Sequence, residues 1–257
     1  MNTSHIGLEV AIIKDDPSAR KVKISVSDDF EDNEAIKFFN KLDIKKGKFQ
    51  VVPDKKKERT SIFIVGKNGS GKSYWIRDYI GEFIKRFPDY PIYLFSSKKE
   101  DENLDDIKEI RRVPIDESFI SDPLQYEQLR ETLCIFDDID GLRGKLKDEI
   151  YHLRDIILKN ARSYKIHIIS TNHDATGRDV QAPLNESDMI VFFMKNYNRC
   201  LRYLLENYVG LEKEQIKNLR KNKSRATTYI KTYPNVFVQE RNITTIEGLN
   251  NEEKPKV

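Results

Sequence analysis

The sequence predicts an α/β fold in which a mainly parallel sheet carries helices on both faces. Three observations indicate this fold. Short apolar runs rich in β-formers alternate along residues 58–205 with longer segments of helical periodicity. A glycine-rich turn joins the first of these runs to a helical segment, and two later runs end in polar or acidic residues. Such alternation is typical of βαβ units, whose strands are parallel and buried between helices.

Residues 1–57 are expected to form a small N-terminal appendage that contains β-structure. The stretches "LEVAIIK" and "KVKISVS" predict two strands, because β-branched residues recur in them between turn-forming residues. The stretch "NEAIKFFNKL" predicts a short helix, and "KFQVV" predicts a further strand. This part of the chain carries no motif that indicates chemistry.

The apolar run 61–65 predicts a buried strand, and apolar residues at helical spacing over 73–87 predict the helix after it. Between them the chain matches G-x-x-x-x-G-K-[ST], the P-loop or Walker A pattern. The pattern is formed by Gly66, Lys67, Asn68, Gly69, Ser70, Gly71, Lys72 and Ser73. Glycines let backbone N–H groups close around a phosphate at the positive end of a helix. The motif therefore predicts binding of ATP with Mg²⁺, with Lys72 on the β- and γ-phosphates and Ser73 on the metal.

The remaining core elements alternate in the same way. Strands are expected in "PIYLFSS", "TLCIFDD", "IHIIST" and "MIVFFMK". A polar loop with a short helix is expected in "KKEDENLDDIKEI", and a helix capped by Asp122 in "DPLQYEQLR". An amphipathic helix is expected in "LKDEIYHLRDIILKNAR". Residues 206–257 are expected to form a C-terminal tail. Its elements are helices in "NRCLRYLLENYV", which begins before the boundary, and in "EKEQIKNLRKN", then a hairpin made by "ATTYIKTY" and "NVFVQER".

Two strands are expected to bring polar side chains to the phosphate loop, because ligands sit at the carboxyl ends of strands in open α/β sheets. Asp137 and Asp138 follow the run "LCIF". We expect Asp137 to hold Mg²⁺ and Asp138 to orient and polarise the attacking water. Thr171, Asn172 and His173 end the next strand, and Asn172 is favoured as a γ-phosphate sensor over Thr171 because its amide both donates and accepts.

Charge that develops on the γ-phosphoryl group calls for an arginine, often supplied by a neighbouring subunit. Arg162, just before the sensor strand in "KNARSYKIHI", is the first candidate. Arg143, Arg178 and Lys67 are the alternatives. The choice among them stays open at the level of sequence.

Composition sets broad limits. Of the 257 residues, 34% are charged, yet the net charge is only +3, which permits a nucleic-acid partner without arguing for one. Cys134 and Cys200 lie far apart without metal-ligand spacing, which is typical of reduced cysteines in an intracellular protein. No apolar run is long enough for a membrane-spanning segment.

The order of "VGKNGSGKS", "IYLFSSKKEDENLDD", "LCIFDDID", "ILKNARSYKIHIISTNH" and "NESDMIVFFMKN" resembles the genome-packaging ATPases of large nucleocytoplasmic DNA viruses and their relatives. These belong to the FtsK–HerA superfamily of P-loop motors that pump DNA. The resemblance covers roughly residues 58–200. The sequence departs from the family in two places. The sensor position, commonly Gln in the family, is Asn172 or His173 here, and the acidic pair, commonly Asp-Glu, is Asp137-Asp138.

The resemblance implies an ATP-hydrolysing ring of identical subunits that drives double-stranded DNA into a capsid. It implies a capsid or portal-like viral protein as partner, and a location in the host cytoplasm or virus factory or with the virion. Three alternatives remain: a P-loop nucleotide kinase, an AAA-type helicase loader, and a nucleotide-gated assembly protein with little hydrolysis. A kinase would need a phosphoryl acceptor other than water to turn over ATP.

A cluster of basic residues in the tail has two interpretations, a solvated surface or a DNA-tracking surface that faces the channel of a ring. Its members are Lys213, Lys217, Arg220, Lys221, Lys223, Arg225 and Lys231, with Tyr229 and Tyr233 nearby.

Overall fold

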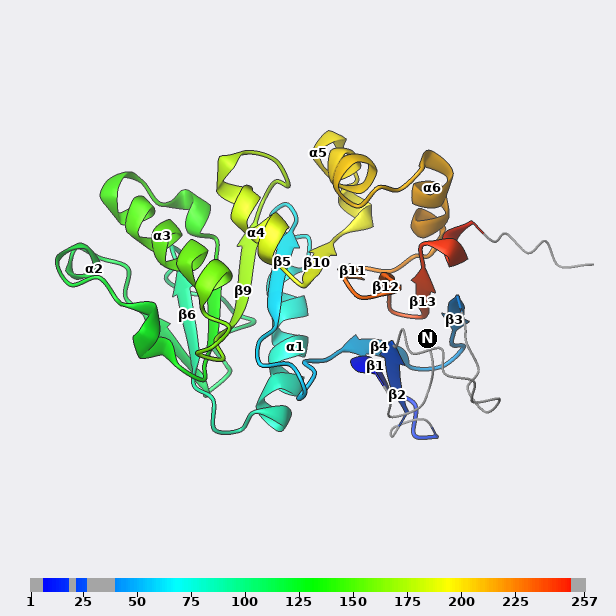
Figure 1. Ribbon diagram of the computed structural model, residues 1–257, viewed down its shortest axis with the longest axis horizontal. Helices are drawn as coiled ribbons and strands as arrows, with labels where there is room; N and C mark the ends of the chain where they lie inside the picture. The colour runs from blue at the N-terminus through cyan, green and yellow to red at the C-terminus, as the bar shows by residue number, and fades with distance from the viewer. Residues whose placement is uncertain (1–6, 19–21, 27–39, 251–257) are drawn as a thin grey trace, which may run out of the picture. The chain divides into compact units, whose positions relative to one another are not determined.

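The computed structural model describes residues 7–18, 22–26 and 40–250, and Figure 1 traces them. Within these ranges, none of the helices is both long enough and apolar enough to cross a membrane.

The chain divides into two compact units. One unit comprises residues 55–191, and the other comprises residues 1–54 together with 192–257. The predicted core, 58–205, falls mainly in the first unit, whereas the predicted appendage and tail fall mainly in the second. The exact domain boundaries stay a prediction.

The sheet of the 55–191 unit runs in the order β10-β5-β9-β8-β6-β7 (Figure 1). Its strands are β5 (Ser61–Val65), β6 (Ile92–Ser96), β7 (Ile110–Val113), β8 (Leu133–Asp137), β9 (His167–Asn172) and β10 (Met189–Phe192). The pairs β5·β9, β9·β8, β8·β6 and β6·β7 are all parallel. Every residue of β5, β8, β9 and β10 is buried, as expected for strands that helices cover on both faces. The structure confirms the predicted α/β P-loop fold.

Two local predictions in this unit are wrong. The segment 98–110, expected to be a polar loop with a short helix, contains turns but no helix, and its last residue begins β7, which the sequence did not predict because "IRRV" has two arginines at its centre and only its ends are apolar. The helix predicted from Asp122 is absent; α2 (Ser118–Ser121) ends at Asp122, and only a 3₁₀ turn, Tyr126–Leu129, follows. Pro123 cannot continue α2, and the segment after it is too short to bury a helical stripe.

Helices cover both faces of this sheet. The long ones are α1 (Lys72–Arg86) and α3 (Gly144–Asn160), and a short one, α4 (Gln181–Glu186), follows β9. Ile168 packs in one core cluster with residues of α3, such as Ile157. Its neighbour His167 packs edge-on against Phe83 of α1, with the two ring centroids 5.0 Å apart. Since adjacent strand residues point to opposite faces, α1 and α3 lie on opposite sides of the sheet.

His167 is a buried neutral histidine. Its Nδ1 accepts a hydrogen bond from the Thr60 backbone N–H at 3.2 Å, and its ring also packs on Phe87 and Tyr90. Burial, and then the charge of Arg59, lowers the pKa of His167 to about 4. Folding therefore favours the unprotonated ring, so this contribution to stability is complete above the unfolded pKa of 6.5 and is lost as the pH falls towards 4.

We expect His167→Asn, whose Oδ1 can take the place of Nδ1 as acceptor, to flatten the acid limb of the stability curve. Between pH 7 and pH 4 the wild-type protein should lose up to about 3 kcal/mol more free energy of unfolding than the variant. Urea unfolding across that pH range measures the difference. Parallel curves for the two proteins would contradict the assignment of a neutral buried ring.

The other unit contains two groups of antiparallel strands. One has the order β2-β1-β4, formed by β1 (Leu8–Lys14), β2 (Lys23–Val26) and β4 (Lys48–Val51). The other has β3, β13, β12 and β11 side by side, with bounds Lys41–Asp43, Asn242–Thr245, Val236–Val238 and Thr227–Ile230. The predicted hairpin is thus present as β11 and β12, and β13 is a further strand that the sequence does not predict.

The helices of this unit are α5 (Arg199–Tyr203), continued by a π turn over Leu204–Tyr208, and α6 (Lys213–Lys221). The helix predicted over 33–42 lies mostly outside the described residues. Where its end is described, at Lys41 and Leu42, the chain is the strand β3 rather than a helix.

Candidate active site

The carboxyl ends of four neighbouring strands meet at one edge of the sheet, and the strand register places them level. Ser96 at the end of β6 lies opposite Asp137 at the end of β8. Asn172 at the end of β9 lies opposite Val65 at the end of β5. The backbone N–H of Gly66 then donates to the Asn172 carbonyl at 3.0 Å. The phosphate loop therefore starts beside the residues that end β8 and β9.

The loop adopts backbone conformations that favour glycine. Gly69 has φ of 71° and Gly71 has φ of 108°, in the left-handed region where a side chain is strained. Gly71 is the residue that precedes α1, so the loop delivers its backbone to the positive end of that helix. Lys72 is buried, and its Nζ donates to the Gly66 carbonyl at 2.8 Å, which folds the lysine back over the loop.

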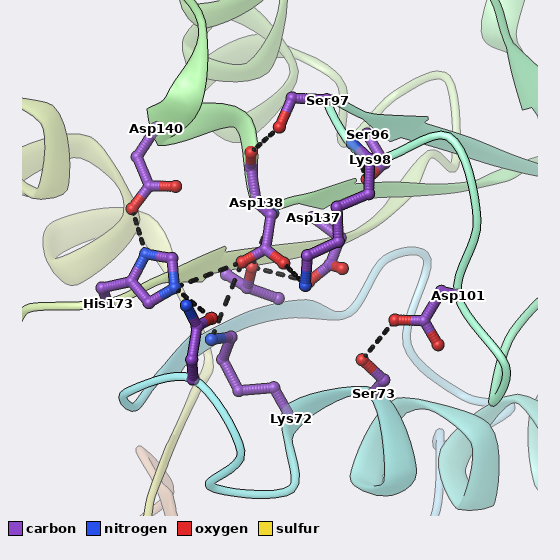
Figure 2. Close-up of polar contacts among 12 residues, drawn as sticks. Lys72, Ser73, Ser96, Ser97, Lys98, Asp101, Asp137, Asp138, Asp140 and His173 are labelled. Carbon is purple, nitrogen blue, oxygen red and sulfur yellow. Dashed lines mark hydrogen bonds and ion pairs between the residues drawn. The ribbon is translucent and has the colours of Figure 1, made fainter.

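Oxygen donors suited to Mg²⁺ lie beside the loop. The Ser73 hydroxyl donates to Asp101 Oδ2 at 2.8 Å, and the buried carboxylate of Asp137 accepts from the Thr171 hydroxyl at 2.8 Å (Figure 2). Hydroxyl and carboxylate oxygens are the ligands that Mg²⁺ prefers. Ser73 and Asp137 thus fit the predicted metal, and Asp101 is a third oxygen donor that the sequence did not single out.

Burial, and then the negative charge of Asp138, raises the pKa of Asp137 to about 6. The hydrogen bond from Thr171 and the charges of Lys72 and Lys98 oppose that rise. A carboxylate whose ionisation is this unfavourable gains most from a cation beside it. The electrostatics of Asp137 therefore match the role of a metal ligand.

Asp138 is enclosed by basic side chains. Its carboxylate forms an ion pair with Lys98, and its Oδ1 lies 3.7 Å from Lys72 Nζ and 3.5 Å from His173 Nε2 (Figure 2). Burial alone would raise its pKa, but the hydrogen bond from Lys98 and the charges of Lys72 and Lys98 prevail and hold the pKa below its usual value. Asp138 is thus an ionised acceptor directly beside the phosphate loop.

The backbone of Asp138 is held by bonds of its own. Its φ is 51°, its N–H donates to Thr171 Oγ1 at 3.1 Å, and its carbonyl accepts from Ser97 Oγ at 2.5 Å. The left-handed turn directs the chain from β8 into the short 3₁₀ turn Ile139–Gly141. Asp140 on that turn can therefore reach His173.

His173 links three parts of the site. Its Nδ1 lies 2.5 Å from Asp140 Oδ2, and its Nε2 lies 2.8 Å from Asn68 Oδ1 in the phosphate loop. The predicted sensor, Asn172, is buried, and its Oδ1 has no hydrogen-bond partner among the described residues. Both residues thus lie at the loop: His173 touches it with its side chain, and Asn172 has a buried acceptor that a bound ligand can satisfy.

Arg162 does not lie at this site. It follows α3 and precedes β9, where its Nε pairs with Glu58 Oε2 at 3.0 Å. The site is at the other end of β9, about five residues or roughly 17 Å further along. Among the alternatives, Arg143 is exposed and donates to the carbonyls of Asp140 and Leu142. Arg178 and Lys67 are also exposed.

Asp138, Asp140 and His173 place one ligand atom each within 4.8 Å of one another. Such a group can hold a metal ion. Lys72 and Lys98 already supply positive charge to Asp138, so we assign no metal to this group.

Sequence reasoning missed Lys98, Asp101 and Asp140. All three lie just after the strands β6 and β8, whose carboxyl ends form the site. Their position after buried strands was a usable signal. It is masked because all three lie within acidic and basic runs, which are usually solvated.

No family model matches the chain. A protein called uncharacterized protein V3, from Sputnik virophage, is 35% identical over 221 residues, which cover 84% of this chain and 89% of that protein. Similar solved structures include B204, the DNA-packaging ATPase from Sulfolobus turreted icosahedral virus, with 18% identity, 68% of this chain and 93% of that chain covered, and a TM-score of 0.47. Another is the genome-packaging NTPase B204 from Sulfolobus turreted icosahedral virus 2 in complex with ATP-gammaS, with 16% identity, 71% and 97% covered, and a TM-score of 0.48. From its identity to protein V3 over most of both chains, the protein belongs to the family that includes V3 of Sputnik virophage.

Proposed function

We propose that the protein is an ATPase whose hydrolysis cycle drives double-stranded DNA into a viral capsid. The observation that carries the ATPase assignment is the meeting of Lys72, Asp137 and Asp138 at one edge of the sheet, beside a loop whose glycines have left-handed backbone conformations. The motor assignment rests on the resemblance of the core motifs to genome-packaging ATPases, and a virophage relative supports a viral context.

The residues divide the chemistry of hydrolysis among them. The loop Gly66–Ser73 wraps the phosphates with backbone N–H groups, and Lys72 compensates the charge of the β- and γ-phosphates. Ser73 and Asp137 hold Mg²⁺, which when bound neutralises charge that develops on the phosphates. Asp138, ionised and held rigidly, accepts a hydrogen bond from the attacking water. Asn172 and His173 position that water and sense the γ-phosphate.

We propose that Arg162 acts on the site of a neighbouring subunit. Its position at the far end of β9 keeps it from its own site, and its side chain is exposed and pairs with Glu58. Head-to-tail contacts between subunits close into rings, in which each site borders its neighbour. Such a ring and a capsid or portal-like partner follow from the motor proposal, as does a location in the cytoplasm or virus factory of an infected cell, or with the virion.

The DNA surface is proposed at the turn between α6 and β11. Two members of the basic cluster contact tyrosines: Arg220 lies over the ring of Tyr197, and Lys231 Nζ donates to the Tyr208 hydroxyl. Lys221, Lys223 and Arg225 are exposed together in and after the last turn of α6. A motor must grip any sequence, so it should contact phosphates rather than base edges.

A triple variant with Lys221, Lys223 and Arg225 all replaced by Ala should bind DNA duplexes more weakly, and the loss of affinity should be about the same for duplexes of unrelated sequence. The slope of log affinity against log salt should fall by roughly one unit for each phosphate that the variant no longer neutralises. Fluorescence anisotropy at several salt concentrations measures both quantities.

The control is a triple variant of the 55–191 unit with the same change in net charge, in which the exposed residues Lys108, Lys145 and Lys159 are replaced by Ala. It should keep the wild-type slope. If the two triple variants have the same slope, the turn is a solvated surface and the DNA-binding residues lie elsewhere.

A further inference from the structure

Lys98 lies two residues beyond the end of β6, on a backbone that is fixed at both sides. Its N–H donates to Ser96 Oγ at 3.2 Å, and its carbonyl accepts from Arg112 Nη1 at 2.8 Å. Its side chain is still 46% exposed, although its ammonium group pairs with a buried carboxylate. A fixed backbone with a long, half-exposed side chain lets the charged end move while its base stays in place.

Two lysines share one carboxylate at this point. Lys98 pairs with Oδ2 of Asp138, and Lys72 lies 3.7 Å from Oδ1 of the same group. The two ammonium groups therefore lie on either side of a single buried anion (Figure 2). Any anionic group that comes to rest against Lys72 will lie within the reach of Lys98.

Asp138 does not need Lys98 to hold its position. Thr171 and Ser97 already fix its backbone on both sides. The contribution of Lys98 to the site is therefore its charge. When a γ-phosphate arrives beside Lys72, two anions, the phosphate and Asp138, come together, and a cation between them offsets their repulsion.

We propose that Lys98 is a second cationic ligand of the γ-phosphate, held by Asp138 until a nucleoside triphosphate binds. This inference rests on the proposed function. It makes Lys98 a residue that distinguishes a triphosphate from a diphosphate, because a diphosphate presents no group to it. The move of Lys98 to the phosphate also frees one oxygen of Asp138 for the attacking water.

The test compares affinities for Mg-ATPγS and Mg-ADP by calorimetry in the wild-type protein and in Lys98→Met, which keeps the length of the side chain and removes its charge. We expect the variant to bind Mg-ATPγS about 10-fold more weakly or worse, since hydrogen bonds to charged groups contribute on that scale. Its affinity for Mg-ADP should stay within about 2-fold. Lys98→Arg, which keeps the charge, should retain most of the preference for the triphosphate.

The matched control is Lys99→Met, because Lys99 is the next residue and is also exposed. It should leave both affinities unchanged. Equal losses for the two nucleotides in Lys98→Met, or no loss, would overturn the role of Lys98 while the proposed ATPase stands. A wild-type protein that binds neither nucleotide would overturn the proposed function and this inference together.

Discussion

Lys72→Ala should abolish ATP turnover, with a loss of about 100-fold or more in kcat, the scale seen when a single charge-stabilising donor is removed from an active site. The ammonium group is buried over the loop and lies beside both the Gly66 carbonyl and Asp138. No other side chain in the loop can supply that charge at the same place, because Lys67 is exposed to solvent. Phosphate release at saturating Mg-ATP measures the effect.

The fold should survive this change, since alanine is the best helix former and Lys72 is the first residue of α1. Lys85→Ala is the matched control, because Lys85 lies on the same helix and its side chain is 65% exposed. It should turn over ATP at the wild-type rate. A Lys72→Ala protein with near-normal turnover would remove the active-site assignment altogether.

The two neighbouring carboxylates should give different phenotypes. Asp137→Ala should weaken binding of Mg-ATP about 10-fold and raise the Mg²⁺ concentration needed for hydrolysis, because Asp137 is the buried carboxylate proposed to bind the metal. Binding of ATP in the presence of EDTA should be little affected. Asp138→Asn should bind Mg-ATP within a few-fold of wild type but lose about 100-fold in turnover, because the water loses its ionised acceptor.

Titration of nucleotide and of Mg²⁺, together with single-turnover hydrolysis, separates these effects. Asp148→Asn, an exposed substitution of the same kind on α3, serves as control and should change neither quantity. If Asp138→Asn proves to be the variant that needs more Mg²⁺, the two roles are exchanged.

The phosphate loop and the strands around it were predictable because their signals are local. A continuous apolar run predicts a buried strand, and the Walker A pattern fixes residue types at set spacings. For Asp137 and Asp138, the position at the end of such a run was enough, since parallel strands bring their carboxyl ends to one edge. The buried strand "LCIFD" and the loop "GKNGSGKS" therefore led to the same site from two directions.

The contacts of Lys98, Asp101 and His173 could not be predicted, because each depends on which loops meet across the sheet. His173 was one of three neighbouring polar residues, and only the fold shows that its ring reaches Asn68 and Asp140. Similarly, β7 and β13 form by pairing with the neighbouring strands β6 and β12, and their own sequences did not predict them. The short helix expected after Asp122 did not form because the segment after Pro123 is too short to bury a helical stripe, although its capping pattern was plausible.

The central claim is that the protein couples ATP hydrolysis to double-stranded DNA. The most direct measurement is the rate of phosphate release by the purified protein at saturating Mg-ATP, without any phosphoryl acceptor, in the presence and absence of double-stranded DNA of unrelated sequences. We predict measurable hydrolysis without DNA, a several-fold stimulation by every duplex, and neither in Lys72→Ala. Phosphate release that requires an added acceptor, or a rate that no duplex changes, would contradict the account.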